Sequence, residues 1–319
     1  MQSFSLSTYA VIKYASLSFF CSLAITSQPS LAQSPLNGTW YNSYCSRMDV
    51  NIDPVSGKIS GEYTSHTGSA GTSPLAGYVD PNAEAPILPA TNPIGIPVSI
   101  GIYWRLVNVD ISQGDNSWHW VSAYAGQYHP EQTVSVPGQL NYQIPETIEI
   151  LNGLFATSTV SGLNDDAPLL WPQTLHFTRA AEAYCESVSP APPVTYTPTA
   201  ADNVSGVWLS EDSTITLTLS ASLETGIVSG TAQYGSNKME VLGVFDTIVP
   251  ELVSTVPRQG LAMALYNDQT KSLVNMTGGV FYEDLNLMEL WVGDLTQTDW
   301  SGRYMQQALV KRLFTRLSN

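Results

Sequence analysis

Gly38-Thr39-Trp40-Tyr41-Asn42 opens the first half of the chain, and Gly206-Val207-Trp208-Leu209-Ser210 opens the second half with the same spacing of Gly and Trp. The two halves also close alike, with His176-Phe177-Thr178-Arg179 and Leu313-Phe314-Thr315-Arg316. Segments that begin and end with matching motifs indicate an internal repeat of one structural unit.

Two further pairs of matching segments lie between these ends, in the same order in both halves. Gly57-Lys58-Ile59-Ser60-Gly61-Glu62-Tyr63 matches Gly226-Ile227-Val228-Ser229-Gly230-Thr231-Ala232. Leu75-Ala76-Gly77-Tyr78-Val79-Asp80 matches Val241-Leu242-Gly243-Val244-Phe245-Asp246. Because the order is preserved, we interpret the chain as a tandem repeat.

Short alternating runs separate these motifs and predict strands. Thr214-Ile215-Thr216-Leu217-Thr218-Leu219 alternates polar and apolar residues, and Gly, Asp, Asn or Pro occupy the turns. Only 12% of the residues are charged. We therefore predict an all-β protein of two tandem antiparallel up-and-down barrels, each with about eight strands. Two Pro-rich insertions, Pro81 to Pro97 and Pro130 to Pro145, explain the longer first half.

A Pro-rich segment marks the boundary between the predicted domains. Residues 186–203 contain four prolines and no apolar periodicity, as expected of a semi-rigid linker. The first barrel is assigned to residues 33–185 and the second to residues 204–319.

The first 32 residues differ from the rest of the chain. They contain one base, Lys13, and no acid, carry an apolar run from Tyr14 to Ile25, and end in Ser30-Leu31-Ala32. This pattern is typical of a secretory signal peptide, so we expect a secreted or periplasmic protein. The alternative is a buried N-terminal strand.

The cysteines support the same expectation. Cys21 lies in the predicted signal peptide, which leaves Cys45 and Cys185 in the exported chain. Two cysteines in an exported protein suggest a disulfide, which would join the two ends of the first barrel. The alternative is a pair of buried thiols.

Charge and motif content argue against several classes of function. There are 27 acidic and 12 basic residues, a net charge of −15, and no basic cluster longer than Lys311-Arg312. We expect no nucleic-acid partner, because no cluster of Lys or Arg residues could neutralise its phosphates. We also expect no membrane partner. The four histidines lack metal-ligand spacing and no phosphate-binding glycine loop occurs, so we expect neither a metal nor a nucleotide cofactor.

The motifs resemble the avidin and streptavidin family, secreted barrels that bind biotin. The resemblance is carried by Gly38-Thr39-Trp40-Tyr41-Asn42 with Ser46, by Gly61-Glu62-Tyr63-Thr64-Ser65, by Val98 to Trp104, by Ala125-Gly126-Gln127 and by the closing Phe-Thr-Arg. It implies two avidin-like barrels in tandem, no enzymatic activity, and biotin as a ligand in place of a cofactor. It also implies pairing of the barrels, with homo-oligomers as a further possibility.

The resemblance assigns the polar side of a biotin site to the first half. It places Asn42, Ser46 and Tyr63 as donors to the urea carbonyl of biotin, Ser65 as acceptor of one urea N–H, and Ser69 near the carboxylate tail. A buried polar group without a partner costs about 1–3 kcal/mol, so such a set is what a buried urea requires. Tyr63 and Ser65 lie on one face of a strand by their spacing.

The resemblance also assigns an apolar side. Trp104 matches a wall Trp, Ser122 a pocket hydroxyl and Tyr124 a second aromatic, while Trp300 in the second half is expected to cover the first site as a lid. For the aromatic residues, ordinary barrel core is the alternative.

Several positions depart from the family pattern. Leu175 replaces an Asp or Asn that accepts the second urea N–H, which weakens the expected site. At the urea positions the second half carries Ser210, Thr214, Ala232 and Tyr234, with Leu265 at the first Trp and Arg312 before the closing Phe. We expect no urea site there.

Three functions follow in order of preference. The first is a secreted, non-enzymatic biotin-binding protein with one site in the first barrel. The second is an avidin-like module that has lost biotin and binds another small ligand or serves assembly. The third is a hydrolase with paired acids, Asp165 and Asp166 or Glu146 and Glu149, although no Ser nucleophile motif accompanies them.

Overall fold

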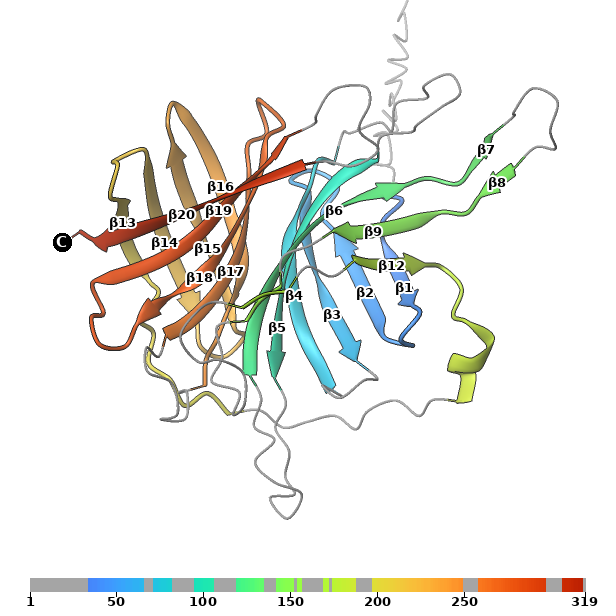
Figure 1. Cartoon of the computed structure of the whole chain (residues 1–319), viewed down its shortest axis with the longest axis horizontal. Coiled ribbons are helices and arrows are strands. Elements are labelled where there is room, and N and C mark those ends of the chain that lie inside the picture. The colour runs from blue at the N-terminus through green and yellow to red at the C-terminus, as the bar shows by residue number, and fades with distance from the viewer. Residues whose placement is uncertain are drawn as a thin grey trace, which may run out of the picture. The chain divides into compact units, whose positions relative to one another are not determined.

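A computed structural model describes most of the chain after the predicted signal peptide. The described residues are 34–65, 71–81, 95–105, 119–134, 142–151, 154–156, 169–171, 174–187, 197–248, 258–296 and 306–317. Two closed antiparallel barrels of eight strands each occupy the two halves, which confirms the predicted all-β tandem fold (Figure 1). The predicted signal peptide and residues 188–196 of the predicted linker lie outside the described residues.

Consecutive strands build the first barrel, and two short hairpins are inserted into its later part. The barrel strands are β1 (Gly38–Asn42), β2 (Arg47–Ile52), β3 (Lys58–Ser65), β4 (Gly71–Val79), β5 (Ile96–Arg105), β6 (His119–His129), β9 (Thr147–Leu151) and β12 (Thr174–Thr178). The hairpins are β7 (Gln132–Val134) with β8 (Tyr142–Ile144) and β10 (Leu154–Ala156) with β11 (Leu169–Trp171).

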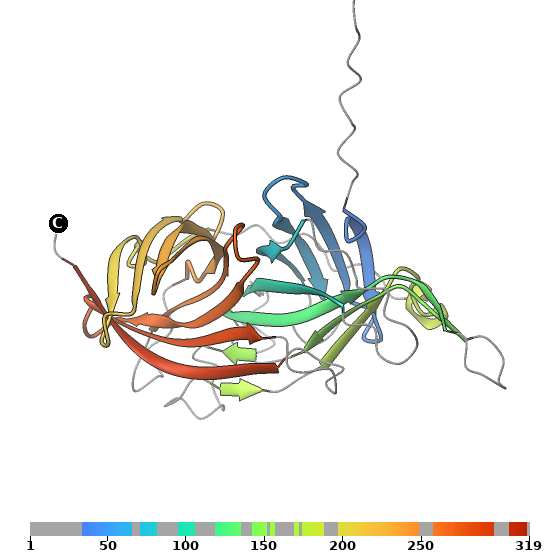
Figure 2. The ribbon, with the colours of Figure 1, turned by 90° about the horizontal axis from the view of Figure 1, so that it is seen from above.

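The two predicted insertions differ from expectation in detail. The second insertion contains the β7–β8 hairpin, which extends away from the first barrel in both views (Figure 2). The first insertion is shorter than expected, because Pro97 already lies in β5, opposite Gln127.

The second barrel is a meander without inserted hairpins among the described residues. Its strands are β13 (Gly206–Ser210), β14 (Ile215–Ser222), β15 (Ile227–Tyr234), β16 (Asn237–Phe245), β17 (Arg258–Tyr266), β18 (Leu273–Phe281), β19 (Leu287–Thr296) and β20 (Gln306–Arg316).

The opening and closing motifs meet where each barrel closes. Asn42 pairs with Phe177, and Ser210 pairs with Phe314. The Trp of each opening motif is fully buried, and its indole N–H donates to a backbone carbonyl, Trp40 to Leu36 and Trp208 to Val204. These pairings explain why the motifs recur together.

The Arg of each closing motif covers that Trp. The Arg179 guanidinium lies 3.6 Å from the Trp40 ring centroid, and Arg316 lies 4.2 Å from that of Trp208. Each Arg also donates to backbone carbonyls of the opening segment, Arg179 to Asn37 at 2.9 Å and Arg316 to Ser205. A cation stacked on an aromatic face, with its donors satisfied, ties the first strand to the last.

The two barrels contact each other through β4, β5 and β6 on one side and β16, β17 and β18 on the other. Tyr103 donates to Asp246 at 2.9 Å, and Tyr266 donates to Asp80 at the same distance. The registers Gly77↔Ile100 and Gly243↔Met263 make Tyr103 equivalent to Tyr266. The two hydrogen bonds are therefore one contact repeated by a pseudo-twofold relation, as in a symmetric dimer.

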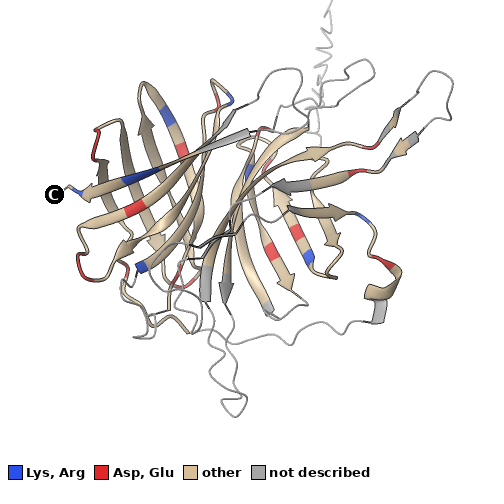
Figure 3. Cartoon of the chain, viewed as in Figure 1, with Lys and Arg blue, Asp and Glu red and all other residues tan. Residues whose placement is uncertain are grey.

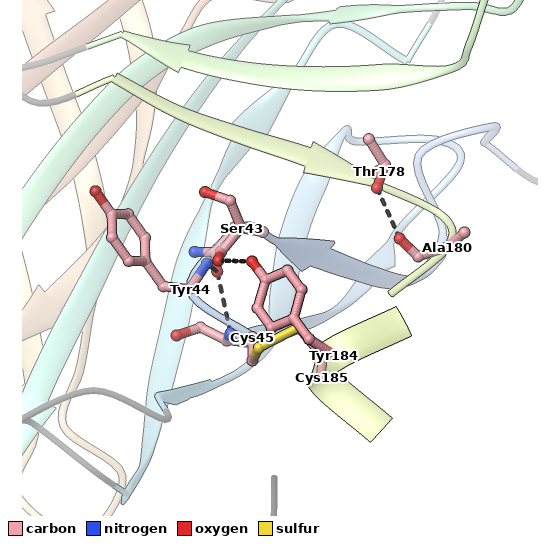
Figure 4. Close-up of a disulfide and its surroundings, with 9 residues drawn as sticks. Ser43, Tyr44, Cys45, Thr178, Ala180, Tyr184 and Cys185 are labelled. Atoms are coloured by element: carbon pink, nitrogen blue, oxygen red, sulfur yellow. Dashed lines mark hydrogen bonds between the residues drawn. A yellow bond between two sulfur atoms is a disulfide. The ribbon is translucent and has the colours of Figure 1, made fainter. Parts of the chain in front are cut away.

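The expected disulfide is present. Cys45 and Cys185, 140 residues apart, join the turn after β1 to the 3-10 helix η2 (Ala183–Ser187) (Figure 4). In the same place Tyr184 donates to the Ser43 carbonyl. The bond thus connects both ends of the first barrel.

Charged residues are sparse on the described strands, and the positions of Lys and Arg are dispersed among them (Figure 3). Within the described ranges, no helix is long and apolar enough to cross a membrane.

Candidate functional site

Three polar side chains of the first half meet at one end of the barrel. Asn42 ends β1, Ser46 precedes β2 and Tyr63 lies in β3, and all three are at most 3% exposed. The Asn42 amide nitrogen donates to the Tyr63 hydroxyl at 3.2 Å. Ser46 is a second hydrogen-bond partner of Tyr63. The structure therefore brings together the three residues that the sequence assigned to one role.

The turn between β1 and β2 fixes the orientation of the Asn42 amide. Its carbonyl oxygen accepts the backbone N–H groups of Tyr44 and Ser46, both at 3.0 Å. The NH₂ group must then point the other way, toward Tyr63. Since an amide nitrogen carries two protons, Asn42 keeps a donor beyond the one given to Tyr63.

Burial keeps Tyr63 neutral. Desolvation raises the pKa of its hydroxyl above the ordinary value, against the opposing effect of hydrogen bonds from Ser46 and Asn42. A neutral phenol that accepts from Asn42 retains its own proton for donation. Ser46 has a single hydroxyl proton, which it donates to Tyr63 here, so it can donate to a bound acceptor only by turning away from Tyr63. The second N–H of Asn42 and the Tyr63 hydroxyl are the other donors of the cluster that suit one acceptor such as a carbonyl oxygen.

The other predicted pocket residues fall into two groups. Ser65 on β3 and Ser122 and Tyr124 on β6 are buried, and Tyr124 belongs to the same apolar cluster as Tyr63. The backbone of Trp104 lies in β5, opposite Trp120 of β6. Ser69 and Trp300 lie outside the described residues.

Leu175 occupies the place of the missing acceptor. It lies in β12, is 5% exposed and belongs to the apolar cluster that includes Tyr63 and Phe177. The Tyr63 ring packs edge-on against Phe177 at 6.3 Å between centroids. The donor cluster is thus faced by hydrocarbon where the family pattern has a polar acceptor.

Strand registers identify the equivalent positions of the second barrel. Met48 pairs with Tyr63, and Leu217 pairs with Ala232, while Leu217 faces Trp208 as Met48 faces Trp40. Ala232 therefore replaces the phenol, as the sequence comparison predicted.

Two of the sequence equivalences are wrong. The same register puts the fully buried Ile215, and not Thr214, at the position of Ser46, because the β13–β14 turn is one residue longer. The registers Leu75↔Ile102 and Val241↔Leu265 make Leu265 equivalent to Ile102, so that Asn267 follows at the position of Trp104. A motif alignment without registers could not locate these shifts of one and two residues.

The polar groups that remain in the second barrel satisfy one another. Ser210 and Thr214 donate their hydroxyls to Asp212 at 2.8 and 2.7 Å, and Arg312 forms an ion pair with the same carboxylate. Hydrogen bonds from Thr214 and Ser210, together with Arg312, lower the pKa of Asp212 to about 2. With Ile215 and Ala232 at the other positions, no donor cluster like that of the first barrel forms.

Of the acids considered for a hydrolase, the structure describes the side chain of Glu146, and of Glu149 only the backbone, in β9. Glu146 accepts from Tyr128 at 2.8 Å and pairs with Arg179 at 3.0 Å, so it takes part in closing the barrel. Asp165 and Asp166 lie outside the described residues. Among the described residues, no group of three or more His, Cys, Asp or Glu side chains is arranged to hold a metal ion.

A donor cluster at one end of a closed eight-stranded barrel can be compared with known families. Residues 30–134 match the Avidin family. The match runs from before β1 to the end of β7 and includes Asn42, Ser46, Tyr63 and Tyr124. Comparison with curated proteins finds no match. The match lies in the first half of the chain, and with an eight-stranded barrel in each half it is consistent with an avidin-like tandem protein.

Proposed function

We propose that the chain is a secreted, non-enzymatic biotin-binding protein with a single site, in the first avidin-like barrel. The observation that carries the proposal is the buried cluster of Asn42, Ser46 and Tyr63, whose donors converge at one end of the barrel. The family match over the same residues supports biotin as the ligand.

The chemistry of the cluster suits a buried urea carbonyl. Its oxygen accepts hydrogen bonds, and hydrogen bonds made in a desolvated site are stronger than those in water. Ser65 would accept a urea N–H, while the bicyclic body of biotin would pack against Tyr124 and the apolar wall. The second barrel lacks both the phenol and the Ser46 hydroxyl, which supports one site per chain.

Tyr63→Phe tests the polar side with little change in volume. Loss of one donor to a buried carbonyl is expected to cost about 1–3 kcal/mol, which is roughly five- to 150-fold in Kd for biotin. Tyr41→Phe, on the same strand pair as Asn42 but half-buried and facing away, is the matched control. Equal biotin affinity in Tyr63→Phe and the parent, measured by calorimetry, would refute the assignment.

A second candidate is supported by Leu175. The buried leucine leaves one urea N–H without its acceptor, a defect that a ligand with a carbonyl and only one N–H would not suffer. Leu175→Asn restores an acceptor on a smaller side chain with the same branch at Cγ, with Leu175→Met as control. Tighter biotin binding in Leu175→Asn supports the urea site, whereas no biotin binding by either the parent or Leu175→Asn favours another ligand.

Export belongs to the same proposal. The signal-like N-terminal sequence and the Cys45–Cys185 disulfide both favour an oxidising compartment. N-terminal sequencing of protein recovered from the extracellular or periplasmic fraction should begin at Gln33. Recovery of the chain with its first 32 residues intact in the cytosol would contradict this part.

A further inference from the structure

Asn275 of the second barrel reaches into the wall of the first. It lies in β18, is 4% exposed, and its amide nitrogen donates to the Ser99 hydroxyl at 3.0 Å and to the Tyr124 carbonyl at 3.1 Å. Both partners are buried, on β5 and β6. One side chain therefore joins the two strands that carry the apolar side of the candidate site.

This contact breaks the pseudo-twofold relation between the barrels. The registers Ile100↔Tyr124 and Met263↔Met276 make Asn275 equivalent to Ala123 and Ser99 equivalent to Ala262. Ala123 and Ala262 share an apolar cluster at the interface. The polar link is consequently made in one direction only, from the second barrel to the first.

The contact lies beside the pairing of β6 with β9 in the first barrel. Ala125 of β6, the residue after Tyr124, pairs with Leu151 of β9. The described strand β10 also lies against β6, and Asn275 adds a hydrogen bond from the second barrel to this stretch of β6, at Tyr124.

We propose that Asn275 is a positioning residue for the ligand site of the first barrel. It holds β5 and β6 together behind Tyr124 and so slows ligand release, although the second barrel has no urea site of its own. This inference rests on the proposed function. The second barrel would then contribute to binding through the contact of Asn275 with β5 and β6 of the first barrel.

The same hydrogen bonds bear on a glycosylation sequon that begins at Asn275. Asn275-Met276-Thr277 is a glycosylation sequon, as are the sequences that begin at Asn37 and Asn203. Because the Asn275 amide nitrogen is buried and donates both hydrogen bonds described above, it is not available for a glycan in the folded protein.

Asn275→Ala and Asn275→Asp test the proposal in the full chain, since Asp keeps the shape but lacks the donor. Two readouts are needed: the biotin dissociation rate, and amide hydrogen exchange of residues 121–126 without ligand. Loss of two buried hydrogen bonds to the wall is expected to speed dissociation on the order of fivefold and to raise exchange in this segment. Asn275→Ser, which keeps one donor, should lie between the parent and Asn275→Ala.

Tyr266→Phe is the matched control. It removes one hydrogen bond of the same interface, to Asp80, without touching Tyr124. Unchanged exchange in residues 121–126 of Asn275→Ala, or an equal change in Tyr266→Phe, overturns the positioning role. Raised exchange with an unchanged dissociation rate overturns its link to the ligand. If the parent does not bind biotin, the proposed function fails, while the exchange data still judge the positioning role.

Discussion

Removing the Cys45–Cys185 disulfide should destabilise the first barrel and leave the second almost unaffected. The perturbation is the double substitution Cys45→Ser and Cys185→Ser. The bond closes a segment of 140 residues. In the chain-entropy model, a closed loop of this length lowers the entropy of the unfolded state enough to stabilise the fold by about 5 kcal/mol.

The local geometry of the site should survive this change. Cys45 has a left-handed φ of 61°, and its N–H donates to the Asn42 carbonyl at 3.0 Å. In the second barrel Ser213 adopts a φ of 57° and donates to the Ser210 carbonyl at 2.8 Å without any disulfide. The turn is therefore stable without the bond, so biotin affinity of the folded double variant should stay within about twofold of the parent, or about 0.4 kcal/mol.

Hydrogen exchange distinguishes the two barrels. The exchange free energies of β1, β2 and β12 should fall by up to about 5 kcal/mol, while those of β15 and β16 stay within about 0.5 kcal/mol. A urea titration monitored in parallel gives the global change. Equal exchange free energies in β1 and β12 of both proteins, or an equal loss in both barrels, would refute the reasoning.

Three other outcomes follow from the structure. Gly230→Ala places a Cβ 1.9 Å from the Thr218 carbonyl oxygen and should lower the free energy of unfolding by at least about 3 kcal/mol. The control is Gly235→Ala, whose Cβ has nothing within 4 Å and which should cost about 1 kcal/mol. Equal urea midpoints of the two variants would contradict the steric argument. Burial raises the pKa of several tyrosines, so the stability they contribute is complete below pH 10 and is lost above it. Between about pH 8 and 12 the urea midpoint should fall while the 295 nm absorbance of tyrosinate rises over the same pH range. A urea midpoint that does not depend on pH would disprove this linkage. The tyrosines concerned are Tyr63, Tyr78, Tyr128, Tyr266 and Tyr282. Arg179→Met removes the cation from the Trp40 face and should lower the melting temperature, with the exposed Arg47→Met as control; identical melting curves would show that the stacked cation is not stabilising.

The barrel architecture was predictable because its signals are local. Alternating runs such as Thr214 to Leu219 predict strands, and the paired motifs around Trp40 and Arg179 recur in the second half around Trp208 and Arg316. Their physical basis is the closure of each barrel, in which the last strand must meet the first. The repeat of these opening and closing motifs can be recognised in the sequence without knowing how the strands pair.

The polar site was partly predictable for a related reason. Asn42 and Ser46 flank one turn, and Tyr63 lies on the next strand, so their meeting depends on short-range pairing. The Thr214 equivalence failed because one residue added in the β13–β14 turn changes the register. The Leu265 equivalence failed by two residues, because only the strand register aligns Leu265 with Ile102. The sequence gives no signal for the role of Asn275, because its partners lie 176 and 151 residues away and belong to the other barrel.

Calorimetric titration of the full chain with biotin tests the central claim most directly. The account predicts saturable binding with one biotin per chain, lost or strongly weakened in Tyr63→Phe and retained in Ala232→Ser of the second barrel. No heat and no shift in melting temperature at about millimolar biotin would contradict it, as would a stoichiometry of two per chain.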